Sequence, residues 1–121
     1  MPIESYRSLS VWQKSVDFVV LVYQLLGRFP KNEQYGLVSQ MQRAAVSIPS
    51  NIAEGKERQS DRDFARFVTI AMGSLAELET QILIAQRLGY LDEADWQEVT
   101  AQADEIGKML RSLHKTLSIT N

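Results

Sequence analysis

The residues best suited to chemistry are basic side chains gathered around one predicted turn. They are Lys56, Arg58, Arg62 and Arg66, and we expect Arg43 to lie within reach of them, one face away. Such a cluster can contact phosphates, and each charge that it neutralises adds a salt-dependent increment of affinity. The same segment also holds Glu57, Asp61 and Asp63, so the alternative is a solvated surface whose charges pair with one another. Two interpretations stay open: a site for nucleic acid, or an ordinary polar turn.

The sequence offers little for catalysis or for a metal site. His114 is the only histidine, and no Glu-x-x-His spacing accompanies it, which makes it a poor metal ligand. Glu77 and Glu79 lie two residues apart and diverge on a helix, so they form no carboxylate pair for acid–base work. There is no cysteine and no glycine-rich phosphate loop. We therefore predict no enzyme, no cofactor and no metal. Catalysis would require a site assembled between subunits.

The composition is typical of a soluble globular protein. Of 121 residues, 45% are hydrophobic and 23% are charged, which favours one folded domain spanning residues 1–121. The formal net charge of -2 gives no global electrostatic case for nucleic acid. The first residues lack a charged-then-apolar secretion signal, and the densest apolar stretch, residues 16–26, is well short of the ~20 residues that cross a bilayer. We expect a cytoplasmic protein without a membrane partner, and the absence of cysteine fits that compartment.

Two apolar stripes run along the first predicted helix. The first stripe is the expected packing seam and comprises Leu9, Trp12, Val16, Val19, Tyr23 and Leu26. The second stripe comprises Val11, Phe18, Val22, Leu25 and Phe29. Both have the three-four spacing of a helix, so this helix presents apolar groups to more than one neighbour. The sequence Phe29-Pro30 ends it, because a residue before proline is steered away from helical angles.

Three further helices follow, each with one apolar stripe. The stripe of the second helix comprises Leu37, Met41, Ala44, Ile48 and Ile52. The stripe of the third helix comprises Phe64, Val68, Ala71, Leu75, Leu78, Ile82 and Ala85. The stripe of the fourth helix comprises Trp96, Val99, Ala103, Ile106, Leu110, Leu113 and Leu117. Ser60 with Asp63 indicates one helix start, Gly89 a helix end, and Asp92 with Asp95 another start. Short connections favour antiparallel neighbours, so we predict an all-α, up-down-up-down four-helix bundle.

Pro49 lies inside the second helical pattern, in the segment RAAVSIPSNIAE. A proline inside a helix removes a backbone bond at a cost of roughly 3 kcal/mol. Because Ile48 and Ile52 continue the apolar stripe across it, we predict a helix that runs on with a bend at Pro49. The alternative is a helix that stops near Ser47 and restarts with Pro49 in its first turn.

Four pieces of the sequence carry a resemblance to a known family. They are LSVWQKSVDFVVLVYQL, FPKNEQYGLVSQMQRAAVSIPSNIAEG, FARFVTIAMGSLAELETQI and LGYL. They resemble the bacterial four-helix-bundle proteins first noticed as reading frames within intervening sequences of 23S ribosomal RNA genes. The resemblance implies an antiparallel bundle that assembles into a ring, in relatives a homopentamer, with no known catalytic activity. The accessory proteins of diversity-generating retroelements are similar in fold and work with RNA and a reverse transcriptase.

Five polar residues match polar positions of the family motifs. They are Arg43, Asn51, Glu54, Ser74 and Glu77. Ser74 and Glu77 stand among the apolar residues of AMGSLAELE, which indicates that they face a partner helix. One interpretation is a buried polar network that fixes the register of the second and third helices, with every group hydrogen bonded. The alternative is contact with a ligand or with nucleic acid.

The first and third predicted helices carry more apolar residues than one bundle interior needs. We expect Val11, Phe18, Val22 and Leu25, together with Phe67, Ile70 and Leu83, to face water unless a second copy covers them. This surplus predicts a non-enzymatic homo-oligomer. The family resemblance and the basic cluster further imply that its polar rim docks RNA or a nucleic-acid-processing enzyme. The alternative is a structural or protein-interaction module without a nucleic-acid role.

Overall fold

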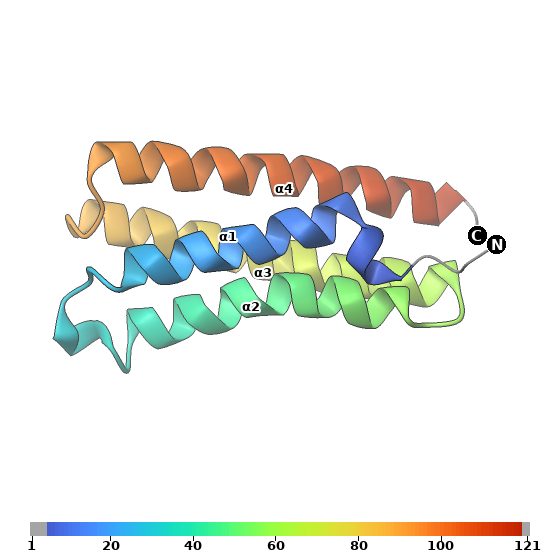
Figure 1. The fold of residues 1–121 in the computed structure, drawn as a ribbon, viewed down its shortest axis with the longest axis horizontal. Coiled ribbons are helices and arrows are strands. Elements are labelled where there is room, and N and C mark those ends of the chain that lie inside the picture. The colour runs from blue at the N-terminus through green and yellow to red at the C-terminus, as the bar shows by residue number, and fades with distance from the viewer. Residues whose placement is uncertain (1–4, 120–121) are drawn as a thin grey trace.

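The computed structural model describes residues 5–119, which form four long helices and no strand (Figure 1). The helices are α1 (Ser10–Leu26), α2 (Leu37–Lys56), α3 (Asp61–Arg87) and α4 (Glu93–Ile119), with short 3₁₀ turns η1 (Tyr6–Ser8) and η2 (Lys31–Glu33). The predicted all-α four-helix fold is confirmed. The two ends of the expected domain, residues 1–4 and 120–121, lie outside the described residues.

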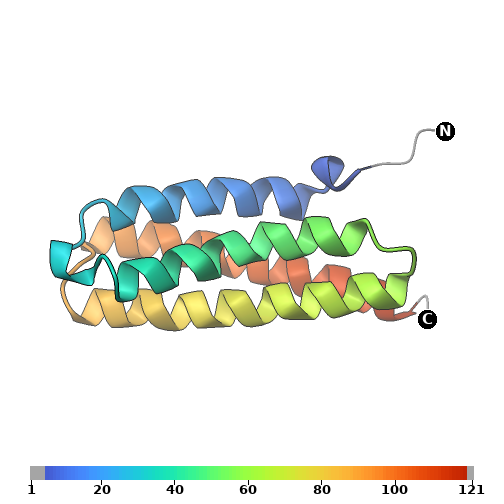
Figure 2. The same ribbon diagram turned by 90° about the horizontal axis from the view of Figure 1, so that it is seen from below.

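The helices lie side by side, and the chain reverses direction from each helix to the next, as the colours of Figures 1 and 2 show. Each helix packs on its successor, and α4 packs back on α1. The most extensive contact joins α2 to α3, while α1 and α4 touch least among the long helices. Because the backbones of α1 and α3 do not approach each other closely, these helices stand diagonally opposite, and their outer faces point to opposite sides of the bundle.

Local polar signals set the helix boundaries in the second half of the chain. Ser60 Oγ accepts the backbone N–H of Asp63 at 3.1 Å and caps α3, as the sequence predicts. Asp92 Oδ1 accepts the N–H of Asp95 at 2.8 Å at the start of α4. Gly89 follows α3 with a φ of 82°, a left-handed conformation that only glycine adopts without steric penalty. These boundaries follow from the sequence alone.

Helix α2 continues through Pro49 as one element. The prediction of an unbroken helix is therefore confirmed, and the bend stays a prediction. Pro49 is buried, and Ala45, the residue whose carbonyl the proline cannot serve, is fully buried as well. Its small side chain leaves room for the ring. Asn51 Nδ2 donates to the backbone carbonyl of Ser47 at 2.8 Å, and not to the carbonyl of Ala45.

The core-facing side of α1 differs from the predicted seam. The buried residues are Val11, Ser15, Phe18, Val22, Leu25 and Leu26. The expectation that Val11, Phe18, Val22 and Leu25 face water was wrong, because these side chains are at most 6% exposed. Ser15 explains the error: its hydroxyl donates to the Val11 carbonyl at 2.6 Å, so a satisfied polar group sits in the buried stripe and interrupts its apolar pattern. The predicted seam is partly exposed instead, at Leu9, Trp12, Val16, Val19 and Tyr23.

Phe67 was also expected at the surface, and this prediction was wrong because the ring is buried. Gly55 of α2 explains its burial. A Cβ added to Gly55 would lie 2.6 Å from the Cβ of Phe67 and 2.9 Å from Cδ1 of Phe64. The missing side chain thus lets α2 and α3 approach closely near their shared turn. Ile70 and Leu83 are exposed, as predicted.

The α1–α2 and α3–α4 connections contact each other at one end of the bundle. The rings of Phe29 and Tyr90 pack with centroids 5.1 Å apart. Tyr90 Oη donates a hydrogen bond to Glu33 Oε2 at 2.8 Å, and this bond raises the pKa of the Tyr90 hydroxyl. Glu33 Oε1 also accepts the backbone N–H of Leu37 at 3.3 Å. A single carboxylate therefore joins both connections to the first turn of α2.

Candidate functional sites

A polar groove of about 510 Å³ runs between α2 and α3. Its lining residues are Gln40, Arg43, Ala44, Ser47, Ser74 and Glu77, and we call it the α2–α3 groove. Three of the five residues predicted as a polar network, Arg43, Ser74 and Glu77, line it. The hollow exists because small side chains face each other here, although the two helices pack extensively elsewhere.

Hydroxyl groups from both helices form the floor of the α2–α3 groove. Ser47 Oγ and Ser74 Oγ lie 2.8 Å apart and share a hydrogen bond. Asn51 Nδ2 donates to Ser47 Oγ at 2.9 Å. Asn51 and Ser74 thus belong to one small network through Ser47, which was not in the predicted set. Ser47 lies four residues before Asn51, and this helical spacing was the available signal.

Opposite charges line the α2–α3 groove without pairing. Arg43 and Glu77 are both exposed, and no ion pair joins them within residues 5–119. Glu77 Oε2 instead accepts a hydrogen bond from Gln81 Nε2 at 3.2 Å. Gln81 is buried, and its Oε1 has no hydrogen-bond partner among the described residues. The predicted network therefore leaves two of its charged members available to another molecule.

Glu54, the fifth member of the predicted set, lies apart from the α2–α3 groove. It is exposed, and its Oε1 accepts from Arg58 Nη2 at 3.4 Å, one helical turn later. The structure therefore divides the predicted set into a groove group and one residue near the turn between α2 and α3.

The basic residues surround the turn between α2 and α3 and one buried ring. The guanidinium carbons of Arg58 and Arg66 lie 4.8 Å and 5.4 Å from the ring centroid of Phe67. Arg66 Nη2 also lies 3.9 Å from Asp63 Oδ1. Lys56 is half-buried and Arg62 is exposed. We call Lys56, Arg58, Arg62 and Arg66 the basic turn; Arg43 lies in the groove instead.

The acidic neighbours of the basic turn equal it in number. Glu54, Glu57, Asp61 and Asp63 lie in the same segment, so its net formal charge is zero. Within residues 5–119, Arg58 and Arg66 are each engaged with a carboxylate. Exposed pairs of this kind contribute at most about 1 kcal/mol each, so a polyanion could displace them.

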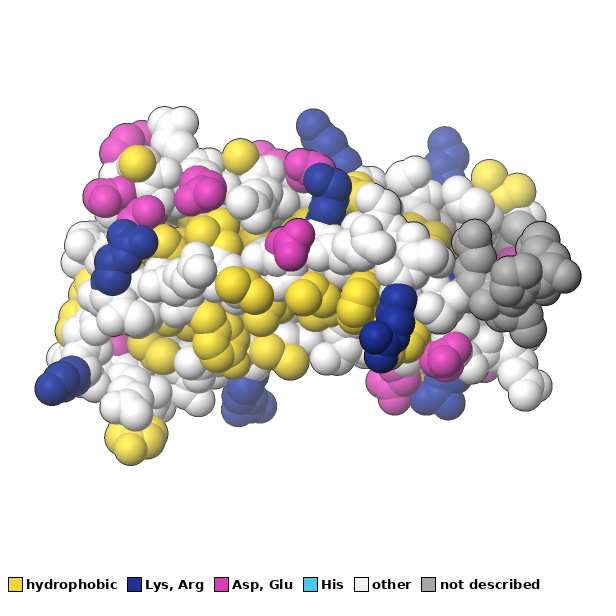
Figure 3. Space-filling model, viewed as in Figure 1, with side chains coloured by type: hydrophobic (Ala, Val, Ile, Leu, Met, Phe, Trp, Pro, Cys, Tyr) yellow, Lys and Arg dark blue, Asp and Glu magenta, His cyan; other side chains and the backbone are white. Residues whose placement is uncertain are grey.

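Two apolar surfaces remain exposed on opposite sides of the bundle. The first, the α1 face, comprises Val19, Val20 and Tyr23 with Val46 of α2, and its residues border two shallow hollows. Figure 3 shows hydrophobic side chains gathered along α1 on this side. The second, the α3 face, comprises Ile70, Leu83, Ile84 and Leu88. Within residues 5–119, α3 is the one helix long and apolar enough to cross a membrane, but a core helix of a bundle has the same composition.

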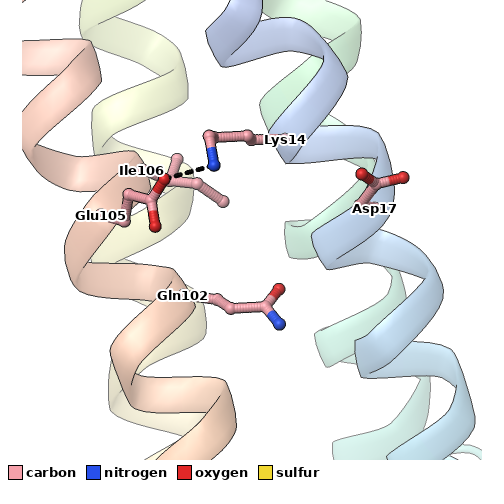
Figure 4. A pocket seen from close by; sticks show the side chains of 5 residues that line it. All are labelled: Lys14, Asp17, Gln102, Glu105 and Ile106. Atoms are coloured by element: carbon pink, nitrogen blue, oxygen red, sulfur yellow. Dashed lines mark ion pairs between the residues drawn. The ribbon is translucent and has the colours of Figure 1, made fainter.

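A second polar hollow, of about 250 Å³, lies between α1 and α4. Figure 4 shows Lys14 of α1 reaching across to Glu105 of α4, with Gln102 pointing into the gap. Lys14 Nζ and Glu105 Oε1 form an ion pair at 2.5 Å. We call it the α1–α4 hollow. Lys14 and Glu105 thus pair with each other, while Asp17, which also lines the hollow, forms no ion pair within residues 5–119. No group of three His, Asp or Glu side chains suited to a metal occurs within the described chain.

The sequence profile of the 23S rRNA-intervening sequence proteins matches residues 7–112. The chain belongs to the 23S rRNA-intervening sequence protein family. This family match covers the α2–α3 groove, the basic turn and both apolar faces, and it ends within α4. The predicted family resemblance is thereby confirmed.

A solved structure supports the family assignment. It is a protein of unknown function from the S23 ribosomal protein family of Bacteroides thetaiotaomicron. The two chains are 30% identical, with a TM-score of 0.80, and the match covers 87% of this chain and 98% of the other. The chain has no match among curated proteins. Family membership thus establishes the fold, and the function must be argued from the residues.

Proposed function

We propose that this family member is a non-enzymatic, homo-oligomeric scaffold of the cytoplasm. The observation that carries the proposal is the pair of exposed apolar surfaces, the α1 face and the α3 face. Val20 and Ile70, for example, are 52% and 46% exposed. Several large exposed apolar side chains on one helix favour an interface. The resemblance to the family adds the expectation of a ring of five copies.

The positions of the two faces favour head-to-tail contact between copies. Because α1 and α3 stand diagonally opposite, a two-fold dimer would cover one face and leave the other in water. A contact between the α1 face of one copy and the α3 face of the next covers both. Repeated, such a contact closes into a ring or extends as a filament.

Complementary variants test the head-to-tail contact. Val20→Asp disables the α1 face and Leu83→Asp disables the α3 face, so each variant alone should be monomeric by light scattering. A mixture of the two should form a one-to-one heterodimer, because each variant retains the face that the other has lost. Ala101→Asp, at an exposed position on α4, is the matched control and should leave the assembly intact. A folded wild-type monomer at micromolar concentration would refute the scaffold, and a Val20→Asp homodimer would refute the head-to-tail contact.

Nucleic-acid docking is a second candidate function, and one observation favours it. Arg58 and Arg66 stack against Phe67, so two guanidinium groups are held at one end of the bundle. Such groups can contact phosphates, and a ring would multiply a weak patch by the number of its subunits. The alternative is a scaffold that binds protein alone.

A structured RNA at two salt concentrations distinguishes these alternatives. Docking predicts an affinity that falls steeply as salt rises and weakens with Arg58→Glu and Arg62→Glu. Arg87→Glu, at the opposite end of α3, is the matched control and should change little. Absence of binding at low salt would leave the protein-binding scaffold.

A further inference from the structure

We propose that the α2–α3 groove binds a small zwitterion of the amino-acid class, with its carboxylate on Arg43 and its ammonium group on Glu77. The proposal goes beyond the scaffold function and does not depend on it. It rests on hydrogen-bonding capacity that two helices bring to one groove and that the chain itself leaves unused.

Arg43 offers the anchor for a carboxylate. Its side chain lines the groove, yet it takes part in no ion pair or hydrogen bond within residues 5–119. A guanidinium carries five N–H donors in a planar fork that matches the two oxygens of a carboxylate. Arg43, which also borders the hollow beside Tyr23 and Val46, therefore keeps its full donor set available for a ligand.

The hydroxyl floor offers one further donor. Ser47 and Ser74 together carry two hydroxyl protons, and the bond between their Oγ atoms uses one of them. Asn51 Nδ2 donates to Ser47 Oγ and so supplies a proton of its own. Whichever serine donates to the other, one hydroxyl proton remains for a ligand.

Glu77 offers the acceptor for an ammonium group. Its Oε2 is held by Gln81 Nε2, and its Oε1 makes no hydrogen bond in the described part of the chain. Gln81 is only 5% exposed, which fixes its amide. Rotation of that amide would place its oxygen against the carboxylate, so the nitrogen must face Glu77. A buried residue thus orients the carboxylate before any ligand arrives.

The combination of charges selects the ligand class. A simple anion would satisfy Arg43 and the hydroxyl group but would be repelled by Glu77. A simple cation would satisfy Glu77 and be repelled by Arg43. A molecule that carries both charges satisfies both residues, and a free α-amino acid is the smallest common example.

Ligand-observed NMR with the wild-type protein tests the proposal with three matched probes. L-alanine carries both charged groups, propionate lacks the ammonium group, and ethylamine lacks the carboxylate. We expect L-alanine to bind at least about tenfold more tightly than either truncated probe. Absence of L-alanine binding at millimolar concentration, or equal binding of propionate, would overturn the proposal.

Single substitutions locate the site. Arg43→Gln and Glu77→Gln should each weaken L-alanine binding by about tenfold or more, with unchanged circular dichroism because both side chains are exposed. Arg87→Gln is the matched control, because Arg87 lies on α3 with Glu77 but outside the groove. If Arg43→Gln binds L-alanine as the wild type does, the groove is not the site.

Discussion

The α2–α3 groove and the α1–α4 hollow resemble each other and differ in one decisive respect. Each lies between antiparallel helices, and each is lined by one basic and one or more acidic side chains. In the α1–α4 hollow, Lys14 and Glu105 pair with each other. In the α2–α3 groove, Arg43 and Glu77 do not pair, and Gln81 holds Glu77 in place from below. Lys14 and Glu105 neutralise each other, whereas the charges of Arg43 and Glu77 remain available for binding another molecule.

The close approach of α2 to α3 can be broken at Gly55. Gly55→Ala places a Cβ 2.6 Å from the Cβ of Phe67, so the helices must move apart, and we expect the free energy of unfolding to fall by about 1–3 kcal/mol. Gly73→Ala is the matched control, because no atom lies within 4 Å of its added Cβ, and it should stabilise the protein by up to about 1 kcal/mol. Urea unfolding of both variants measures the contrast. Equal effects in the two variants would contradict it.

The hydroxyl floor can be removed with Ser74→Ala. Ser47 then loses its partner across the helices, and we expect a loss of about 0.5–1.5 kcal/mol in the free energy of unfolding. Ser50→Ala, at an exposed position of α2, should change stability little. A double-mutant cycle of Ser47→Ala with Ser74→Ala isolates the pair, and zero coupling would show that the bond contributes nothing to stability.

The contrast between paired and unpaired charges can be sharpened with Lys14→Gln and Arg43→Gln. Lys14→Gln breaks an ion pair whose side chains are 47% and 52% exposed, so the loss of stability should be at most about 1 kcal/mol and should shrink at high salt. Arg43→Gln removes no pair and should leave the unfolding midpoint unchanged. Greater destabilisation by Arg43→Gln than by Lys14→Gln would show that Arg43 is engaged within the bundle.

The smallest expected effect is the pH dependence of stability that arises from Glu79, between α3 and α4. Burial raises the pKa of Glu79, Asp104 raises it further, and Arg111 opposes them. As pH rises above the unfolded value near 4.5, the unfolded chain releases its proton first, so stability falls until the folded group has also ionised. Glu79→Gln should remove this fall and slightly raise stability at neutral pH. Chemical unfolding from pH 4 to pH 7 measures it, and an unchanged profile would contradict the cause assigned.

The helices and their ends could be predicted because their signals are local. Ser60, Asp92 and Gly89 act within a turn of their own positions. The buried face of α1 could not be predicted, because two stripes with equal spacing competed and Ser15 disguised the correct one. Phe67 was misplaced for a similar reason: its burial depends on Gly55, which lies on another helix.

Only some residues of the α2–α3 groove could be predicted from the sequence. Family motifs pointed to Arg43, Ser74 and Glu77, and the structure brings them to one groove. Helical spacing allows Glu54 to pair with Arg58 and Gln81 to bond to Glu77, since each pair lies four residues apart. Spacing does not show that Gln81 is buried or that Glu54 lies outside the groove, because both depend on how each helix is rotated toward its neighbour.

The contact of Phe29, Tyr90 and Glu33 makes the two ends of the bundle different. Two connections meet there, whereas the opposite end carries the α2–α3 turn, the beginning of α1 and the end of α4 (Figure 1). Local opening should therefore be graded along the long axis. In deuterium exchange, amides near the free helix ends should be replaced first, and those close to the double connection should persist longest.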